Sequence, residues 1–173
     1  MNDLMSKENM KLGATFGVPA GVLTLLSFIP CIGWAFNIVA WLVILAGGYV
    51  TVMVKGGNKD QMSTVLKNSM MASIPAAVIV AVASAVSSVL GTLFFFPRIA
   101  YFDIGPSITD FIVPAVIAFV VAIIWVIIMF MVGSFIGVYV PQEKLPSNVR
   151  DLLNKFKGYA TGSSTPTSTG AAM

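Results

Sequence analysis

Residues 111–142 read FIVPAVIAFVVAIIWVIIMFMVGSFIGVYVPQ, a run of 32 residues without one charged side chain. Two similar runs precede it, with 43 residues between Lys11 and Lys55 and 30 residues between Lys67 and Arg98. One helix needs roughly 20 apolar residues to cross a hydrocarbon core about 30 Å thick. The first run is therefore long enough for two spans, and each of the other two runs for one.

The overall composition points to the same class of protein. Of the 173 residues, 57% are hydrophobic and only 10% are charged, whereas about a quarter of the residues of a typical soluble domain are charged. Too few charged side chains are present to cover the surface of a water-soluble fold of this size. The sequence therefore predicts an all-α fold, a polytopic transmembrane helix bundle of about four spans.

The turn signals divide this transmembrane domain, which we place at residues 12–140. Pro30 and Gly33 mark a tight turn between the first two spans, and Pro97 ends the third. The fourth span is longer than a bilayer requires, so we expect it to tilt or to project. The expected spans are residues 12–29, 34–54, 68–96 and 108–140.

The basic residues indicate the orientation. Nine of the ten Lys and Arg residues fall on one side of the four-span arrangement, and only Arg98 falls on the other. Because basic loops are retained in the cytoplasm, we expect a multi-pass protein of the cell membrane with both termini in the cytoplasm, residues 1–11 forming the N-terminal segment. A rival hypothesis makes the first apolar segment a secretory signal, but the segment is long for one and Pro30 lies inside the would-be cleavage site.

The character of the chain changes after the fourth span, at residues 141–157. Apolar residues recur there at i, i+3, i+4 and i+7 from Val149 to Phe156, which predicts a short amphipathic helix. We interpret it as a helix on the cytoplasmic membrane surface, with a partner-binding helix as the alternative. Residues 158–173 carry too little apolar content to fold, so we expect a disordered tail. The basic residues beside the apolar stripe are Arg150, Lys155 and Lys157.

Small residues at every fourth position form the clearest local pattern in the spans. Membrane helices have no hydrophobic driving force between them, so close approach of small residues and dispersion supply the attraction. We expect such residues at helix contacts, within the subunit or against another chain. They are Gly13, Gly17 and Gly21 in the first span, Ser73, Ala77, Ala81 and Ala85 in the third, and Gly133 and Gly137 in the fourth.

A second pattern, an apolar residue followed by proline and alanine, occurs near the start of three spans. Its copies are Val18-Pro19-Ala20, Ile74-Pro75-Ala76 and Val113-Pro114-Ala115. The pattern is consistent with a duplicated helix pair, an arrangement that is common in transporters. A chance match of so short an apolar motif is the alternative.

Three short motifs carry a resemblance to a known group of proteins: Gly17-Val18-Pro19-Ala20-Gly21, Phe28-Ile29-Pro30 and Ala46-Gly47-Gly48-Tyr49. Through them, residues 13–92 resemble the small, mostly uncharacterised four-helix membrane proteins of archaea and bacteria. The resemblance implies glycine-rich paired spans around a proline-containing turn, and it implies no particular activity. The long fourth span and the basic tail depart from the pattern.

Groups for catalysis and metal binding are sparse. The chain has one cysteine and no histidine, so the usual zinc, haem and copper ligand sets are missing. We expect no catalytic residues, no metal and no cofactor. No basic run with interleaved aromatic residues occurs, which argues against nucleic acid as a partner.

Three functional hypotheses follow. The first is a non-enzymatic accessory or scaffold subunit of a membrane assembly. For the protein as a whole we expect the lipid bilayer and either a homo-oligomer or a larger membrane complex as partners, a homo-oligomer alone favouring a pore. The second is a small oligomeric pore or transporter, although the spans lack the ionisable residue that such proteins usually carry. The third, an enzyme acting on a lipid, is disfavoured by the missing catalytic groups. A pore would have to use the serines of the third span, Ser73, Ser84, Ser87 and Ser88.

Overall fold

The computed structural model describes residues 7–55, 59–99, 108–140 and 142–161. Over these ranges every regular element is a helix, which confirms the all-α prediction. Two short 3-10 helices, Lys59–Gln61 and Gln142–Lys144, precede α3 and α5. The five α-helices are α1 (Lys7–Leu26), α2 (Gly33–Lys55), α3 (Met62–Ile99), α4 (Ile108–Tyr139) and α5 (Ser147–Thr161).

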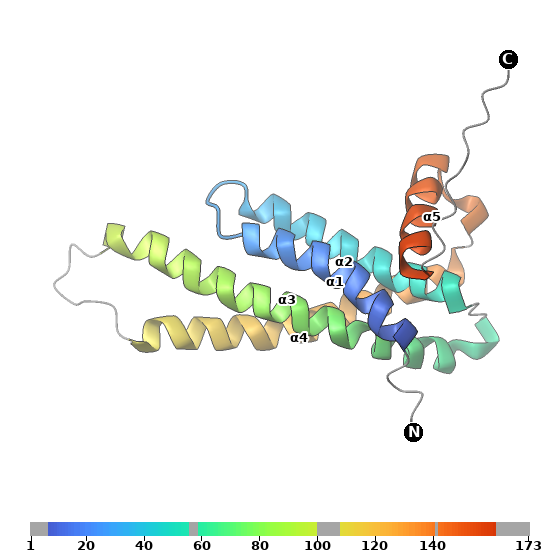
Figure 1. Cartoon of the computed structure of the whole chain (residues 1–173), viewed down its shortest axis with the longest axis horizontal. Helices are drawn as coiled ribbons and strands as arrows, with labels where there is room; N and C mark the ends of the chain where they lie inside the picture. The colour runs from blue at the N-terminus through green and yellow to red at the C-terminus, as the bar shows by residue number, and fades with distance from the viewer. Residues whose placement is uncertain (1–6, 56–58, 100–107, 141, 162–173) are drawn as a thin grey trace, which may run out of the picture.

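The first four helices run up and down as a bundle (Figure 1). α1 and α4 each pack against both α2 and α3, so α1 and α4 occupy opposite corners of the bundle. The α3–α4 hairpin is longer than the α1–α2 hairpin and extends beyond the turn between α1 and α2 (Figure 1). α5 lies across the other end of the bundle, where it contacts α1 and α2.

The turn between α1 and α2 begins three residues before the predicted end of the first span. α1 ends at Leu26 because the hydroxyl and the backbone N–H of Ser27 both donate to the carbonyl of Thr24, at 2.6 and 3.1 Å. Cys31 then adopts a left-handed backbone with φ of 73°. The N–H of Gly33 donates to the carbonyl of Ile29 at 2.8 Å as α2 begins.

The other boundaries differ from the prediction at both ends of the bundle. At the far end Pro97 does not end the third helix, because α3 continues to Ile99; the larger differences lie at the basic end. α1 already begins within the predicted N-terminal segment, and α3 begins at Met62, six residues before the predicted start of the third span. α5 continues to Thr161, so residues 158–161 of the predicted disordered tail are helical. One glycine costs a helix only about 1 kcal/mol relative to alanine, and Gly158 does not end α5. The predicted tail beyond Thr161 lies outside the described residues.

Within the described residues, three helices are long and apolar enough to cross a membrane, which is compatible with an integral membrane protein. They are Gly33–Lys55, Lys59–Phe94 and Ile108–Tyr139. α1 is not among them, so four spans are not confirmed. The part of α1 that follows its last charged residue has 15 residues, Leu12 to Leu26, or about 22 Å at 1.5 Å per residue.

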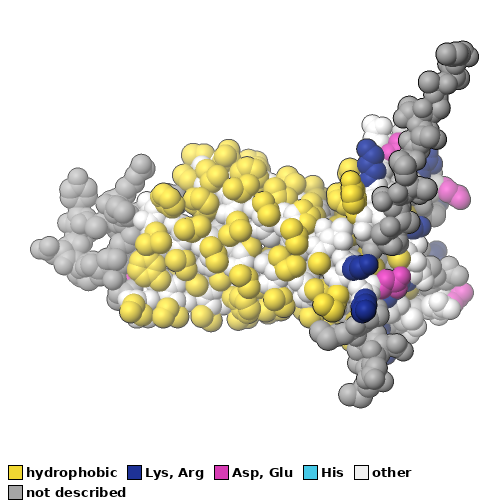
Figure 2. Space-filling view, viewed as in Figure 1, with side chains coloured by type: hydrophobic (Ala, Val, Ile, Leu, Met, Phe, Trp, Pro, Cys, Tyr) yellow, Lys and Arg dark blue, Asp and Glu magenta, His cyan; other side chains and the backbone are white. Residues whose placement is uncertain are grey.

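Charged and apolar side chains are separated along the bundle (Figure 2). On the face seen in this view, apolar side chains cover the length of the bundle, whereas the described lysine, arginine, aspartate and glutamate side chains gather at the end where α5 lies. The buried core lies toward this basic end, around Phe16 of α1 and Phe130 of α4, which are both fully buried. Phe156 of α5 packs against Phe16, with ring centroids 5.4 Å apart.

Candidate functional site

The predicted glycines of α1 lie against α3. A Cβ on Gly13 would stand 2.3 Å from the carbonyl oxygen of Ala72, and one on Gly17 would stand 2.7 Å from Cα of Ala76. At Gly21 the nearest atom is a side-chain carbon of Ile79, at 3.0 Å. The α1 glycines therefore meet a stripe of α3 that neighbours the predicted one. Of the predicted α3 residues, Ser73, Ala77 and Ala81 are buried and Ala85 is half-buried.

A second close contact joins α2 and α4 in the half of the bundle nearer the basic end. A Cβ on Gly133 would stand 2.0 Å from the carbonyl oxygen of Leu45, and one on Gly137 would stand 3.3 Å from that of Tyr49. On the α2 side, a Cβ on Gly48 would stand 2.0 Å from the carbonyl oxygen of Phe130. The spacing of small residues does not single out Gly48. The adjacent pair Gly47-Gly48 inside an apolar helix is the signal that points to it, because glycine weakens a helix interior unless a close contact requires it.

Hydrogen bonds fix the same half of the α2–α4 contact. The hydroxyl of Ser134 donates to the carbonyl of Gly48 at 3.0 Å, and the hydroxyl of Tyr49 donates to the carbonyl of Val140, also at 3.0 Å. The second bond satisfies a carbonyl at the end of α4 that has no partner within a regular helix. The two helices are therefore held together from Leu45 to the end of α4.

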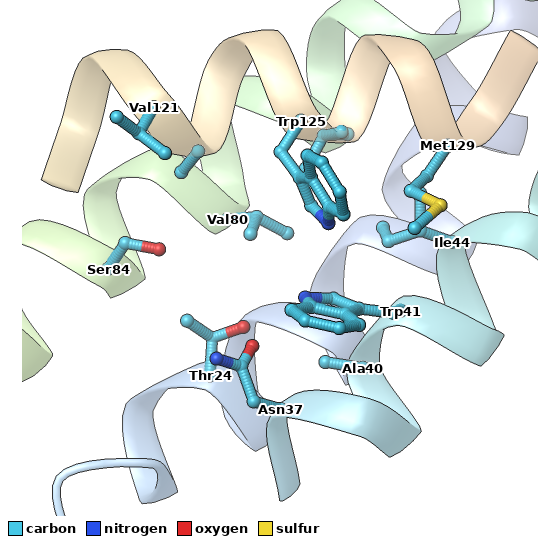
Figure 3. A pocket seen from close by; sticks show the side chains of 12 residues that line it. Thr24, Asn37, Ala40, Trp41, Ile44, Val80, Ser84, Val121, Trp125 and Met129 are labelled. Carbon is cyan, nitrogen blue, oxygen red and sulfur yellow. The ribbon is translucent and has the colours of Figure 1, made fainter. Parts of the chain in front are cut away.

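The other half of the α2–α4 contact is open, because two tryptophans take the place of the glycines. The rings of Trp41 and Trp125 lie 5.5 Å apart with 57° between their planes, and they hold the helices apart. Beside them is a cavity of about 320 Å³ to which all four bundle helices contribute (Figure 3). Its lining consists of Thr24, Asn37, Ala40, Trp41, Ile44, Val80, Ser84, Val121, Ala122, Trp125, Val126 and Met129.

The cavity has a polar side and an apolar side. Thr24, Asn37 and Ser84 lie on the side nearer the α1–α2 turn, and Ile44 and Met129 lie on the opposite side (Figure 3). The hydroxyl of Thr24 donates to the carbonyl of Ala20 at 2.8 Å. The side chains of Asn37 and Ser84 make no hydrogen bond to another residue in the described ranges. None of the 12 lining residues is charged.

The polar side of the cavity lies far from the basic end of the bundle. Asn37 stands 18 residues before Lys55 on α2, which is about 27 Å of helix. Ser84 stands 17 residues after Lys67 on α3, or about 26 Å. If a hydrocarbon core about 30 Å thick started near these lysines, the polar side of the cavity would lie close to the opposite membrane boundary and the apolar side would lie deeper.

A smaller hollow of about 20 Å³ lies near the basic end, between α2 and the first turns of α3. Thr51, Lys55, Asn68 and Ser69 are among its lining residues. The hydroxyl of Ser69 is buried and is the one buried side-chain polar atom in the described residues without a hydrogen-bond partner. Lys55 is turned toward α1, where its ammonium group donates to the side-chain oxygen of Asn9.

Ser69→Ala is expected to leave the protein equally stable or to stabilise it. A buried hydroxyl without a partner costs about 1–3 kcal/mol of desolvation, and the alanine variant removes that cost. Thermal unfolding of the purified protein in detergent measures the effect, and Thr51→Ala is the matched control. The hydroxyl of Thr51 donates to the carbonyl of Gly47 at 2.9 Å, so its loss should not stabilise. A clear loss of stability in Ser69→Ala would show that the hydroxyl is satisfied, for instance by a water in the hollow.

The apolar stripe predicted for the C-terminal helix divides into two parts on α5. Leu153 is buried and Phe156 packs against the core, whereas Val149 and Leu152 are exposed, Leu152 by 55%. The bundle therefore covers half of the stripe, and only the half with Val149 and Leu152 is free to meet a membrane surface or a partner. The three predicted basic residues differ in exposure: Arg150 and Lys155 are exposed and Lys157 is half-buried.

Among the residues that the structure describes, no group of three or more His, Cys, Asp or Glu side chains is arranged to hold a metal ion. In the comparisons with protein-family models, curated proteins and solved structures, none matched this chain. The features of the described residues that bear on function are three apolar helices compatible with a membrane protein, the cavity and the basic end.

Proposed function

We propose that the protein is a non-enzymatic accessory or scaffold subunit of a membrane assembly, with four spans and both ends on the cytoplasmic side. The observation that carries this proposal is the position of α5. It lies across the basic end of the bundle (Figure 1) and is anchored through Leu153 and Phe156. A helix fixed in this way presents its remaining side chains at the membrane surface.

The outer surface of α5 has the chemistry of a docking element. Leu152 and Tyr159 are exposed by 55% and 74%, and the exposed cations of Arg150 and Lys155 belong to the same helix. Aromatic residues and arginine are the residue types enriched at protein interfaces. The same pattern also suits anionic lipid headgroups, each basic residue contributing about 1 kcal/mol near such a surface.

The packing of α1 supports a fourth crossing. α1 follows α3 from Gly13, next to Ala72, to the turn, where the hydroxyls of Ser27 and Ser87 lie 3.2 Å apart. Since α3 is apolar enough to cross a membrane, a helix packed along it shares its depth. In this arrangement the buried face of α1 meets its neighbours, whereas Val18 and Val22 on the other face, exposed by 53% and 52%, are apolar side chains that suit contact with lipid.

The alternative, a small oligomeric pore or transporter, is favoured by the polar side of the cavity. One copy offers no continuous path, because Phe16 and Phe130 fill the interior between the cavity and the basic end. A Cβ on Gly47, just beyond the cavity lining, would lie within 3.0 Å of both rings. A pore would therefore have to form between several copies.

The test is extraction of the full-length tagged protein in a mild detergent, with measurement of the mass of the complex and identification of its components by mass spectrometry. We expect a stoichiometric complex with a different membrane protein. A homo-oligomer without any other protein would contradict the accessory function and favour the pore.

Variants of α5 show whether this helix makes the contact. Serine at both Val149 and Leu152 is expected to release the partner, because these exposed side chains supply the apolar part of the surface. Asn148→Ser, an exposed change elsewhere on α5, should retain the partner. Replacing Arg150, Lys155 and Lys157 by Gln tests the charges. If the partner stays bound to all of these variants, α5 is not the docking element.

A further inference from the structure

We propose that the cavity binds one hydrocarbon chain of a membrane lipid from the leaflet opposite the basic end, with an uncharged hydrogen-bonding group of that lipid at Asn37 and Ser84. The proposal goes beyond the accessory function and does not depend on it. It is carried by the volume of the cavity, by its opening toward lipid and by the direction of its polarity.

The volume and lining suit an apolar chain. The cavity of about 320 Å³ equals the share of roughly ten water molecules in liquid water, at about 30 Å³ each. It also reaches the lower end of ligand pockets, about 300 to 1,000 Å³. Most of its lining is aliphatic or aromatic, and such side chains lose dispersion contacts when the space beside them is empty. At this depth in a membrane the cavity is surrounded by lipid acyl chains, so an acyl chain is the molecule that can fill it.

The opening lies between α2 and α4. Trp41 and Trp125 are exposed by 38% and 39%, and Val121 by 56%, although all three line the cavity. The same side chains therefore face both the cavity and the outside of the bundle. In a membrane, the outside at this level is the acyl region, so a chain can enter sideways without passing through water.

The polar and apolar sides of the cavity are arranged in the same order as the polar and apolar parts of a lipid in that leaflet. Asn37, Thr24 and Ser84 lie near the membrane boundary, where the polar part of a lipid would be, and Ile44 and Met129 lie deeper (Figure 3). The amide of Asn37 can donate and accept, and it has no partner within the described residues. Because no charged side chain lines the cavity, it fits an ester, hydroxyl or amide group and not an ion.

The face of α3 that carries Ser84 continues with small residues toward the end of the helix. Ser88 and Gly91 follow Ser84 at i+4 and i+7, and so lie on the same face of α3. A Cβ on Gly91 would meet no atom within 4 Å, so the space in front of this face stays open. Small and polar residues therefore lead from the cavity toward the region of lipid headgroups.

The experiment uses the full-length protein in nanodiscs of unlabelled phosphatidylcholine, titrated with a monoacylglycerol that carries bromine at mid-chain. Bromine quenches tryptophan fluorescence on contact. The chain has three tryptophans, so a Trp34→Phe background leaves only the two beside the cavity. We expect quenching that saturates at a low mole fraction and is reversed by excess unbrominated monoacylglycerol. A brominated fatty acid, ionised at neutral pH, should bind more weakly.

Variants separate the cavity from ordinary lipid contact. Asn37→Leu removes one hydrogen bond and should raise the half-saturating mole fraction about fivefold. Ser84→Leu places a larger side chain in the cavity and should abolish saturable quenching. Val82→Leu is the control, because Val82 is exposed on the outer face of α3, and it should bind like the parent. If Ser84→Leu fails to fold, Asn37→Leu decides the question.

Two outcomes would overturn the proposal. Quenching that rises linearly with mole fraction, and is equal in all variants, would mean that bulk lipid touches only the outer edges of Trp41 and Trp125. Quenching by water-soluble acrylamide, without any by the brominated chain, would mean that the cavity holds water.

Discussion

Gly48→Ala is expected to prevent the bundle from assembling, although it adds a single methyl group. The new Cβ would stand 2.0 Å from the carbonyl oxygen of Phe130 and 2.9 Å from the backbone nitrogen of Ser134. These are backbone atoms, so α2 and α4 would have to separate. Overpacking costs about 1–3 kcal/mol, and separation would also break the hydrogen bond from Ser134 to Gly48, worth about 1 kcal/mol.

Gly91→Ala is the matched control for this prediction. It is the same substitution in another long apolar helix, but its Cβ would meet nothing within 4 Å. Because alanine favours a helix by about 1 kcal/mol over glycine, this variant should be equally or more stable. Size-exclusion chromatography after heating in detergent compares the two. Equal melting temperatures for Gly48→Ala and Gly91→Ala would contradict the close approach of α2 and α4.

The native cysteine is expected to react with a membrane-impermeant maleimide added to intact cells. Cys31 is the single cysteine of the chain and is exposed in the turn between α1 and α2. In the proposed orientation this turn lies outside the cell, so labelling should be nearly complete in the parent and absent in Cys31→Ser. A mass shift on a gel measures it.

Two further cysteines test the ends of the bundle in the Cys31→Ser background. Lys7→Cys, at the start of α1, and Tyr159→Cys, on α5, should be labelled only after the cells are permeabilised. If Lys7→Cys is labelled from outside in this background, and Cys31 is labelled from outside in the parent, α1 does not cross the membrane and the protein has three spans. If Tyr159→Cys is labelled from outside and Cys31 of the parent is not, the orientation is the reverse of the proposed one.

The elements of the fold could be predicted from the sequence because lipid imposes a strong local rule. Helices that cross the hydrocarbon core must be apolar for their whole length, so α2, α3 and α4 appear as charge-free runs. The end of α1 could not be predicted in this way. Its charge-free run continues to Ile29 and beyond, but the hydrogen bond from Ser27 to Thr24 ends the helix at Leu26.

The pairing of the helices could not be predicted in the same way. α4 is apolar on all faces, and no periodicity indicates which side meets α2. The cavity depends on Trp41 and Trp125, which are far apart in the sequence and adjacent only because α2 packs against α4. The spacing of small residues predicted the face of α1 that contacts α3. On α3 it predicted a stripe next to the one that α1 contacts, because alanines occupy several faces of that helix.

The two hairpins differ in length, and this gives the protein an apolar belt of uneven height. α2 has 23 residues, about 35 Å, whereas the 30 uncharged residues of α3 between Lys67 and Arg98 extend for about 45 Å. Lipids beside α3 and α4 must stretch or the molecule must lean, at a cost of fractions of a kcal/mol per Å. In a membrane, copies that placed their longer α3–α4 hairpins side by side would share the stretched lipid, so a thin membrane would favour association of copies and a thick membrane would favour their separation.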